Sequence, residues 1–267
     1  TSNTEHNTSF ESRESVYPKD TWNGDTWNTS IPRGANWGME AIDAPGAWAY
    51  LDELTTVNIG LIDGLPNISH PDLENMFSNV SYTVIDKDTG FINSKTVDIQ
   101  PYDHGCHVSG IINANWNNGE GVDGVMANKA KLHYSCHLYL IDNKTGKLYF
   151  GASAYEYFLS IKELVDQDVR VINISMGYED LLSFAASNKN EKAINLITES
   201  ANILDGYLSR LISTREAEGK SDFVICVAAG NANNDYFYKD DKSDWGYRKM
   251  TLFDKFISIF GWRGEQG

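Results

Sequence analysis

The chain has 267 residues, and its 37 Asp and Glu outnumber its 22 Lys and Arg, which gives a formal net charge of −15. A chain of this length can bury a sizeable core, and we expect one domain. A strongly acidic surface repels phosphate backbones and anionic lipid, so we expect no nucleic-acid partner. We also expect no membrane insertion, because no apolar run approaches the length that spans a bilayer.

Residues 1–35 form a polar N-terminal arm by composition, since Asn, Ser, Thr and charged residues dominate and the apolar residues set no period. The chain starts at Thr1 without a charged-then-apolar leader, so export cannot be read directly. The three cysteines, Cys106, Cys136 and Cys226, fall in segments that we expect to be buried. An odd number of cysteines indicates no disulfide framework.

The first predicted strand covers residues 56–63, which form a nearly continuous apolar run that ends in Asp63. Such a run is typical of a central parallel strand that is covered on both faces. Residues 77–103 are polar and irregular, and they predict a loop with some strand character.

A histidine, His104, opens the run DHGCHVSGII at residues 103–112, which predicts the first turns of a buried helix. A ring held there can move protons at the end of a sheet. We expect His107 to be a structural histidine. We reject Cys106 as a nucleophile, because its side chain should point away from the working edge of the His104 ring.

The middle of the chain alternates between predicted strands and helices. Residues 130–141 predict a strand, residues 152–166 a helix with apolar residues at helical spacing, and residues 169–176 another buried strand. This alternation indicates a parallel sheet.

A long insertion at about residues 180–220 predicts one helix with a single apolar stripe. A cap at Asn188, with Glu191 three residues later, should open it, and it should close near Gly219. The spacing also fits a coiled-coil seam that binds a partner, but we favour packing against the sheet as a crossover helix. The stripe consists of Ile194, Ile197, Ala201, Leu204, Leu208 and Leu211.

The last predicted strand, residues 222–229, leads to Asn231. An Asn after an apolar strand and two small residues can aim its amide N–H at a developing negative oxygen, although a plain turn is the alternative.

Four ordered segments together resemble the subtilisin-like serine proteases: IGLIDG at 59–64, the histidine run at 103–112, VINISMG at 171–177 and VAAGN at 227–231. The run NWGMEAIDAPGAW at 36–48 resembles the segment that leads into the family's catalytic domain. The resemblance implies a peptidase domain over residues 36–267, with a three-layer α/β/α fold and a mostly parallel central sheet.

The same resemblance assigns roles to individual residues. His104 is implied as the general base, Asp63 as its orienter and Asn231 as the oxyanion donor, all at the carboxyl edge of the sheet. One residue departs from the pattern, since the family continues its Asp as D-[ST]-G, and Gly64 follows Asp63 here.

Substrate binding is implied at Ser175, Met176 and Gly177, which resemble the family's S-x-G edge segment. There the substrate backbone lies as an added strand, so we expect a peptide or protein substrate.

The nucleophile is missing, because the sequence contains no G-T-S, and neither Ser243 nor Ser258 has a fitting context. We therefore expect a serine endopeptidase domain that is incomplete at its C-terminus, with its serine beyond Gly267, and a chain that is inactive alone. An unfinished core could drive self-association. The alternative is a pseudoprotease that binds peptides or a protein partner.

No cofactor is expected for catalysis, although calcium commonly stabilises this family and its ligands here are unknown. His104, Cys106 and His107 give no complete metal-ligand set, and neither do His133 and His137. The resemblance implies an extracellular or cell-envelope location.

Overall fold

The computed structural model describes residues 13–18, 37–92, 99, 103–150, 154–176 and 190–228. By its internal contacts the chain divides into two compact units. The first contains Thr1–Val57, Ser69–Met76 and Gly110–Ala130, and the second contains Asn58–Ile68, Phe77–Ser109 and Lys131–Gly267. The domain limits at residues 35 and 36 stay a prediction.

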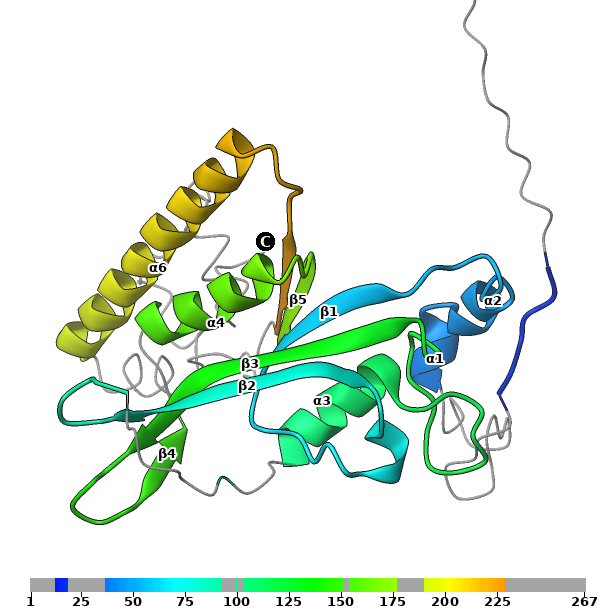
Figure 1. The fold of residues 1–267 in the computed structure, drawn as a ribbon, viewed down its shortest axis with the longest axis horizontal. Helices are drawn as coiled ribbons and strands as arrows, with labels where there is room; N and C mark the ends of the chain where they lie inside the picture. The colour runs from blue at the N-terminus through cyan, green and yellow to red at the C-terminus, as the bar shows by residue number, and fades with distance from the viewer. Residues whose placement is uncertain are drawn as a thin grey trace, which may run out of the picture. The chain divides into compact units, whose positions relative to one another are not determined.

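The second unit contains the sheet, in which the described strands run in the order β2-β3-β1-β5-β6, with β4 paired to β3 (Figure 1). Strand β1 pairs in parallel with β5, β2 with β3, and β5 with β6, whereas β3 and β4 are antiparallel. The strands are β1 (Val57–Ile62), β2 (Phe77–Asp86), β3 (Ala130–Ile141), β4 (Leu148–Phe150), β5 (Val171–Ile174) and β6 (Val224–Val227).

Helices flank this sheet on both sides, with α4 and α6 on one side and the start of α3 on the other (Figure 1). They are α3 (Asp103–Asn113), α4 (Ala154–Asp166) and α6 (Glu191–Ala217). The predicted mostly parallel sheet with flanking helices is therefore confirmed.

The core of the sheet lies where β1 and β5 face α4. Leu164 and Ile172 are fully buried there, and a Cβ atom placed on Gly60 of β1 would lie 2.8 Å from Leu164 Cδ1. A glycine in β1 therefore lets the helix approach the strand closely. Close packing of this kind keeps the carboxyl end of β1 in a fixed place.

The predicted strand at 130–141 has the observed limits of β3, and the predicted helix at 152–166 begins two residues later as α4. The prediction of a loop with some strand character at 77–103 missed the extent of the strand, because Phe77–Asp86 is strand β2, which is parallel to β3 with two register shifts. Polar side chains alternate along β2, so it shows no apolar run. The expectation that Cys226 is buried was also wrong, since it lies exposed on β6, whereas Cys136 is buried and Cys106 half-buried.

The long predicted helix exists as α6, which ends at Ala217, and the predicted closing residue Gly219 follows with a φ of 65°. The N–H groups of Gly219 and Lys220 donate to the carbonyls of Glu216 and Arg215, which is a Schellman ending. The predicted cap at Asn188 lies outside the described residues.

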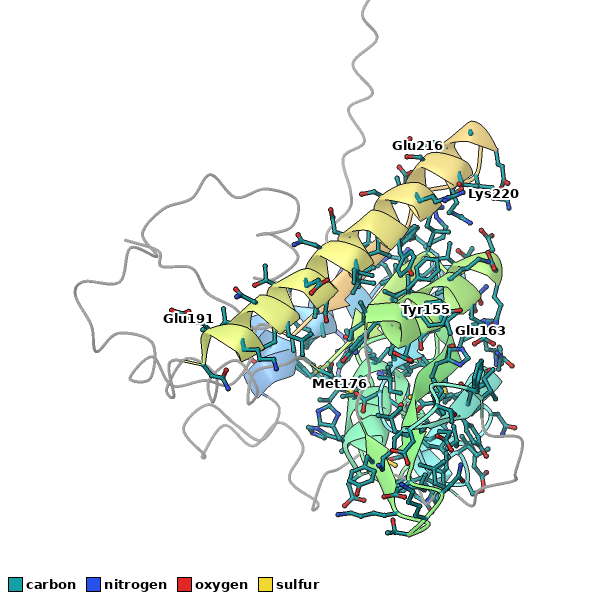
Figure 2. The ribbon with its side chains drawn as sticks, turned by 90° about the vertical axis from the view of Figure 1, so that its left-hand side faces the viewer. Tyr155, Glu163, Met176, Glu191, Glu216 and Lys220 are labelled. Carbon is teal, nitrogen blue, oxygen red and sulfur yellow. The ribbon has the colours of Figure 1, made fainter. Side chains whose placement is uncertain are left out.

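Helix α6 lies along α4, and Figure 2 shows the two helices side by side, with Tyr155 and Glu163 on α4. The Tyr207 ring stacks on Phe158 with centroids 4.8 Å apart. Arg215 is buried, and its guanidinium donates to Val165 O near the end of α4. These contacts anchor the second half of the insertion on α4.

The first unit contains two short helices, α1 (Trp37–Ala41) and α2 (Ala44–Trp48). Trp48 is its centre, because this buried ring packs edge-on against Trp116, with centroids 6.1 Å apart, and its indole N–H donates to Val125 O. In the described part of the chain, no helix is long and apolar enough to cross a membrane.

Candidate active site

Asp63 follows β1 directly, and β1 lies between β3 and β5 in the sheet. Its side chain is only 2% exposed. A carboxylate at this position is fixed by a central strand and lies at the carboxyl edge of the sheet, where α/β folds place their chemistry.

His104 is the second residue of α3, and its Nδ1 lies 2.8 Å from Asp63 Oδ1 and 2.9 Å from Oδ2. Asp63, which the resemblance implies as the orienter of His104, therefore lies within hydrogen-bond distance of its ring. An Nδ1–H that donates to the carboxylate leaves Nε2 as the basic nitrogen of the ring. The His104 side chain is 43% exposed, so a substrate can reach the ring while the Asp63 carboxylate stays shielded from water.

A close approach of backbone to backbone brings the two residues together. A Cβ atom placed on Gly105 would lie 1.9 Å from the carbonyl oxygen of Gly64. Only a glycine after His104 allows the start of α3 to touch the turn after Asp63. The H-G pair in the histidine run thus has a steric cause.

Burial raises the pKa of the Asp63 carboxyl, and hydrogen bonds from His104 and from the Gly64 N–H oppose this rise. The Gly64 N–H donates to Asp63 Oδ1 at 2.6 Å. The departure from D-[ST]-G has therefore not removed the backbone bond to the carboxylate, nor its contact with His104.

The neighbouring candidates on α3 are placed differently. The Cys106 sulfur accepts a hydrogen bond from the Asn67 N–H at 3.0 Å, so it faces the loop after Asp63, not the exposed edge of His104. His107 is exposed on α3, and its structural role stays a prediction.

The predicted substrate segment begins directly after β5, which pairs with β1 through Ile174 and Ile62. Ser175 Oγ accepts a hydrogen bond from Asn173 Nδ2, and Figure 2 labels Met176. Both residues thus follow a strand next to the one that carries Asp63. Gly177 and the predicted oxyanion donor Asn231 lie outside the described residues.

A second histidine–carboxylate pair was missed in the sequence. His137 Nε2 lies 2.9 Å from Glu163 Oε2, and His137 Nδ1 lies 2.6 Å from Thr83 Oγ1. The buried Ser135 hydroxyl donates to the same Glu163 oxygen. The signal was the alternation of polar residues at His133, Ser135 and His137, which puts all three on one face of β3.

Metal ligands do not gather in the described residues, where no group of three or more His, Cys, Asp and Glu side chains could hold an ion. His133, considered above with His137, instead lies 3.0 Å from Gln167 Oε1 through its Nδ1.

Among known protein families, the model of the Peptidase S8 (Subtilase) family matches residues 55–257 of this chain. The chain belongs to the subtilase family. Subtilases are serine-type peptidases, and the matched residues contain the Asp63–His104 pair.

Two characterised subtilases are similar over about half of this chain. The major intracellular serine protease of Bacillus subtilis is 32% identical over 143 residues, which are 52% of this chain and 40% of that protein. Halolysin of Haloferax mediterranei is 28% identical over 145 residues, 54% of this chain and 25% of that protein. The chain therefore spans less than half the length of these subtilases.

Among solved structures, the nisin leader peptidase NisP from Lactococcus lactis matches with 25% identity and a TM-score of 0.33. That match covers 46% of this chain and 32% of the peptidase.

Proposed function

We propose that the chain provides the Asp/His part of a serine-type endopeptidase site. The observation that carries the proposal is the contact of His104 Nδ1 with both oxygens of Asp63 at 2.8 and 2.9 Å, with the ring 43% exposed. In this proposal the nucleophilic serine lies beyond Gly267, because the 267 residues contain no G-T-S segment.

Each residue has one chemical task. His104 Nε2 takes the proton of the serine hydroxyl as that oxygen attacks the scissile carbonyl, and later returns it to the leaving amine. Asp63 stays ionised, holds the Nδ1–H tautomer and stabilises the imidazolium that forms. Asn231 donates its amide N–H to the oxyanion, and loss of such a donor costs about a hundredfold or more in rate.

The substrate would be an extended peptide that pairs with residues 175–177. Main-chain hydrogen bonds would supply its affinity, and a pocket beside Met176 would favour a large apolar side chain before the cut. The position of Ser175 and Met176 directly after β5 supports this placement.

A pseudoprotease that binds peptides is the second candidate, and Gly64 is the observation that favours it. The unbroken contact between Asp63 and His104 supports the enzyme instead. Structural calcium, an extracellular or cell-envelope location and self-association through an unfinished core rest on family membership and sequence, and they remain proposals.

A fluorophosphonate probe, which labels active serines, tests the proposal. We expect no labelling of the 267-residue chain and rapid labelling of a chain extended through the next G-T-S segment. Hydrolysis of a casein substrate by the extended chain should follow the labelling. Efficient labelling of the short chain at Ser243 or Ser258 would show that the nucleophile is misplaced. A reading frame that continues past Gly267 without any G-T-S segment would favour the pseudoprotease.

A further inference from the structure

The turn that carries the candidate orienter contains a residue with unusual freedom. Gly64 follows Asp63 directly, and a glycine populates more backbone conformations than any other residue. Yet the Asp63 carboxylate meets His104 Nδ1 with both oxygens within 2.9 Å. Something other than the side chain at position 64 must therefore hold this turn.

Two tyrosines of β3 contact the backbone on either side of Gly64. The Tyr134 hydroxyl donates to the carbonyl oxygen of Asp63. The Tyr139 hydroxyl accepts a hydrogen bond from the Leu65 N–H at 2.6 Å. The two phenols thus hold the carbonyl before Gly64 and the N–H after it.

Both rings are built into the core, since Tyr134 is 1% exposed and Tyr139 is 6% exposed. Burial raises the pKa of Tyr139 to about 12 and also raises that of Tyr134, so both hydroxyls keep their protons in ordinary buffers. The two hydroxyls also interact with each other. Together the two hydroxyls pair with one carbonyl and one N–H of the turn.

We propose that Tyr134 and Tyr139 are positioning residues that fix the turn at 63–65, so that the Asp63 carboxylate meets His104 Nδ1. The proposal rests on the proposed function, because it gives the aligned carboxylate a catalytic purpose. Neither tyrosine touches the reacting atoms, and both act through Asp63.

The steric contact on the other side of the turn makes this role specific. The Gly64 carbonyl oxygen lies where a Cβ of Gly105 would be 1.9 Å away, so the turn and the start of α3 are in direct contact. A turn released from the tyrosines would move against α3, next to His104. Its release should therefore disturb the Asp63–His104 bond more than the rest of the sheet.

The test is NMR of the full 267-residue chain with ¹⁵N-labelled histidine, before and after Tyr134→Phe and Tyr139→Phe. The readouts are the tautomer of His104, from its two nitrogen shifts, and the exchange rate of its Nδ1 proton with water. His104→Gln assigns the signals among the six histidines. Tyr82→Phe is the matched control, because this 40% exposed ring packs edge-on against Tyr139, with centroids 6.4 Å apart.

In the wild type and in Tyr82→Phe we expect a protected Nδ1–H. In each of the other two variants its exchange should accelerate about tenfold, as the loss of one hydrogen bond allows, with circular dichroism unchanged. If the Nδ1–H exchange rate and the tautomer of His104 in Tyr139→Phe equal those of the wild type, the proposal is overturned and the proposed function still stands. A wild type without a protected Nδ1–H would overturn the proposal through the Asp63–His104 contact itself.

Discussion

His104 and His137 each hold a carboxylate at nearly the same distance, 2.8 Å to Asp63 and 2.9 Å to Glu163, but their surroundings differ. The His104 side chain is 43% exposed, and its carboxylate is 2% exposed. The order is reversed in the second pair, where the His137 side chain is 13% exposed and that of Glu163 is 30% exposed. A buried carboxylate with an exposed ring suits proton transfer to a substrate, whereas a mostly buried ring with a partly exposed carboxylate suits packing.

The hydrogen-bond order separates the two pairs further. Ser135, His137 and Glu163 have the composition of a serine-type triad, but the Ser135 hydroxyl donates to Glu163 and lies 3.5 Å from His137 Nε2. His137 Nδ1 is hydrogen-bonded to the Thr83 hydroxyl. A triad needs the base between the serine and the acid, so this cluster under α4 is structural (Figure 2 labels its Glu163).

The largest expected effect distinguishes the two histidines by activity. In a chain that carries the serine, His104→Gln should lower kcat about 10⁶-fold, because the base is lost. His137→Gln, the matched change, should leave kcat/KM close to wild type and lower only the midpoint of thermal unfolding. Equal losses of activity in the two variants would remove the distinction.

A steric change tests how the first pair is assembled. Gly105→Ala should destabilise the chain by about 1–3 kcal/mol, because the new methyl group meets the Gly64 carbonyl. Gly110→Ala on the same helix is the control, since nothing lies within 4 Å of its Cβ, and it should stabilise by up to about 1 kcal/mol. Urea unfolding followed by circular dichroism measures both. An unaltered stability of Gly105→Ala would mean that α3 does not touch the turn in solution.

Acid sensitivity tests the second pair. Burial tends to raise the pKa of Glu163, but hydrogen bonds from Ser135, Ser81 and His137 outweigh it and leave the pKa below its ordinary value of 4.5. A lowered carboxyl pKa stabilises the fold above the unfolded pKa, and this contribution disappears as the pH falls through the folded pKa. Glu163→Gln should therefore cost stability at pH 7, on the order of 1 kcal/mol, and much less near pH 3. The free energy of unfolding at both pH values checks this, and an equal cost at both would contradict it.

The smallest effect concerns the carboxylate of the first pair. Burial raises the pKa of Asp63, so its contribution to stability is full below the unfolded pKa and is lost as the pH rises through the folded pKa. Asp63→Asn removes this dependence, so the variant should gain stability relative to wild type between pH 3 and pH 7. Denaturant titrations at the two pH values measure the gain, and a relative loss would show that the His104 bond outweighs burial.

The sequence predicted those parts of the fold whose signals are local. The apolar run before Asp63, the strand at 130–141 and the helix that closes near Gly219 all have strong periodicity or end signals, and the structure confirms them. The strand β2 was missed because its half-exposed, polar alternation resembles a loop until its pairing with β3 is known.

Only the residues of the candidate site that lie in recognisable motifs could be predicted from the sequence. Asp63 and His104 come from different segments that the family resemblance joins, and their contact is present. The support from Tyr134 and Tyr139 could not be predicted, because two aromatic residues in a buried strand normally indicate core. Only the position of β3 beside β1 brings their hydroxyls to the turn around Gly64.

In our proposal, Asp63 and His104 act on a serine of the same enzyme. The most direct test is a crystal structure of the extended chain after it reacts with a fluorophosphonate. We predict that the modified serine lies in a G-T-S segment, with its Oγ about 2.6–3.2 Å from His104 Nε2 and with Asp63 still on Nδ1. A modified serine elsewhere, such as Ser135 beside His137, or one out of reach of His104, would contradict the account.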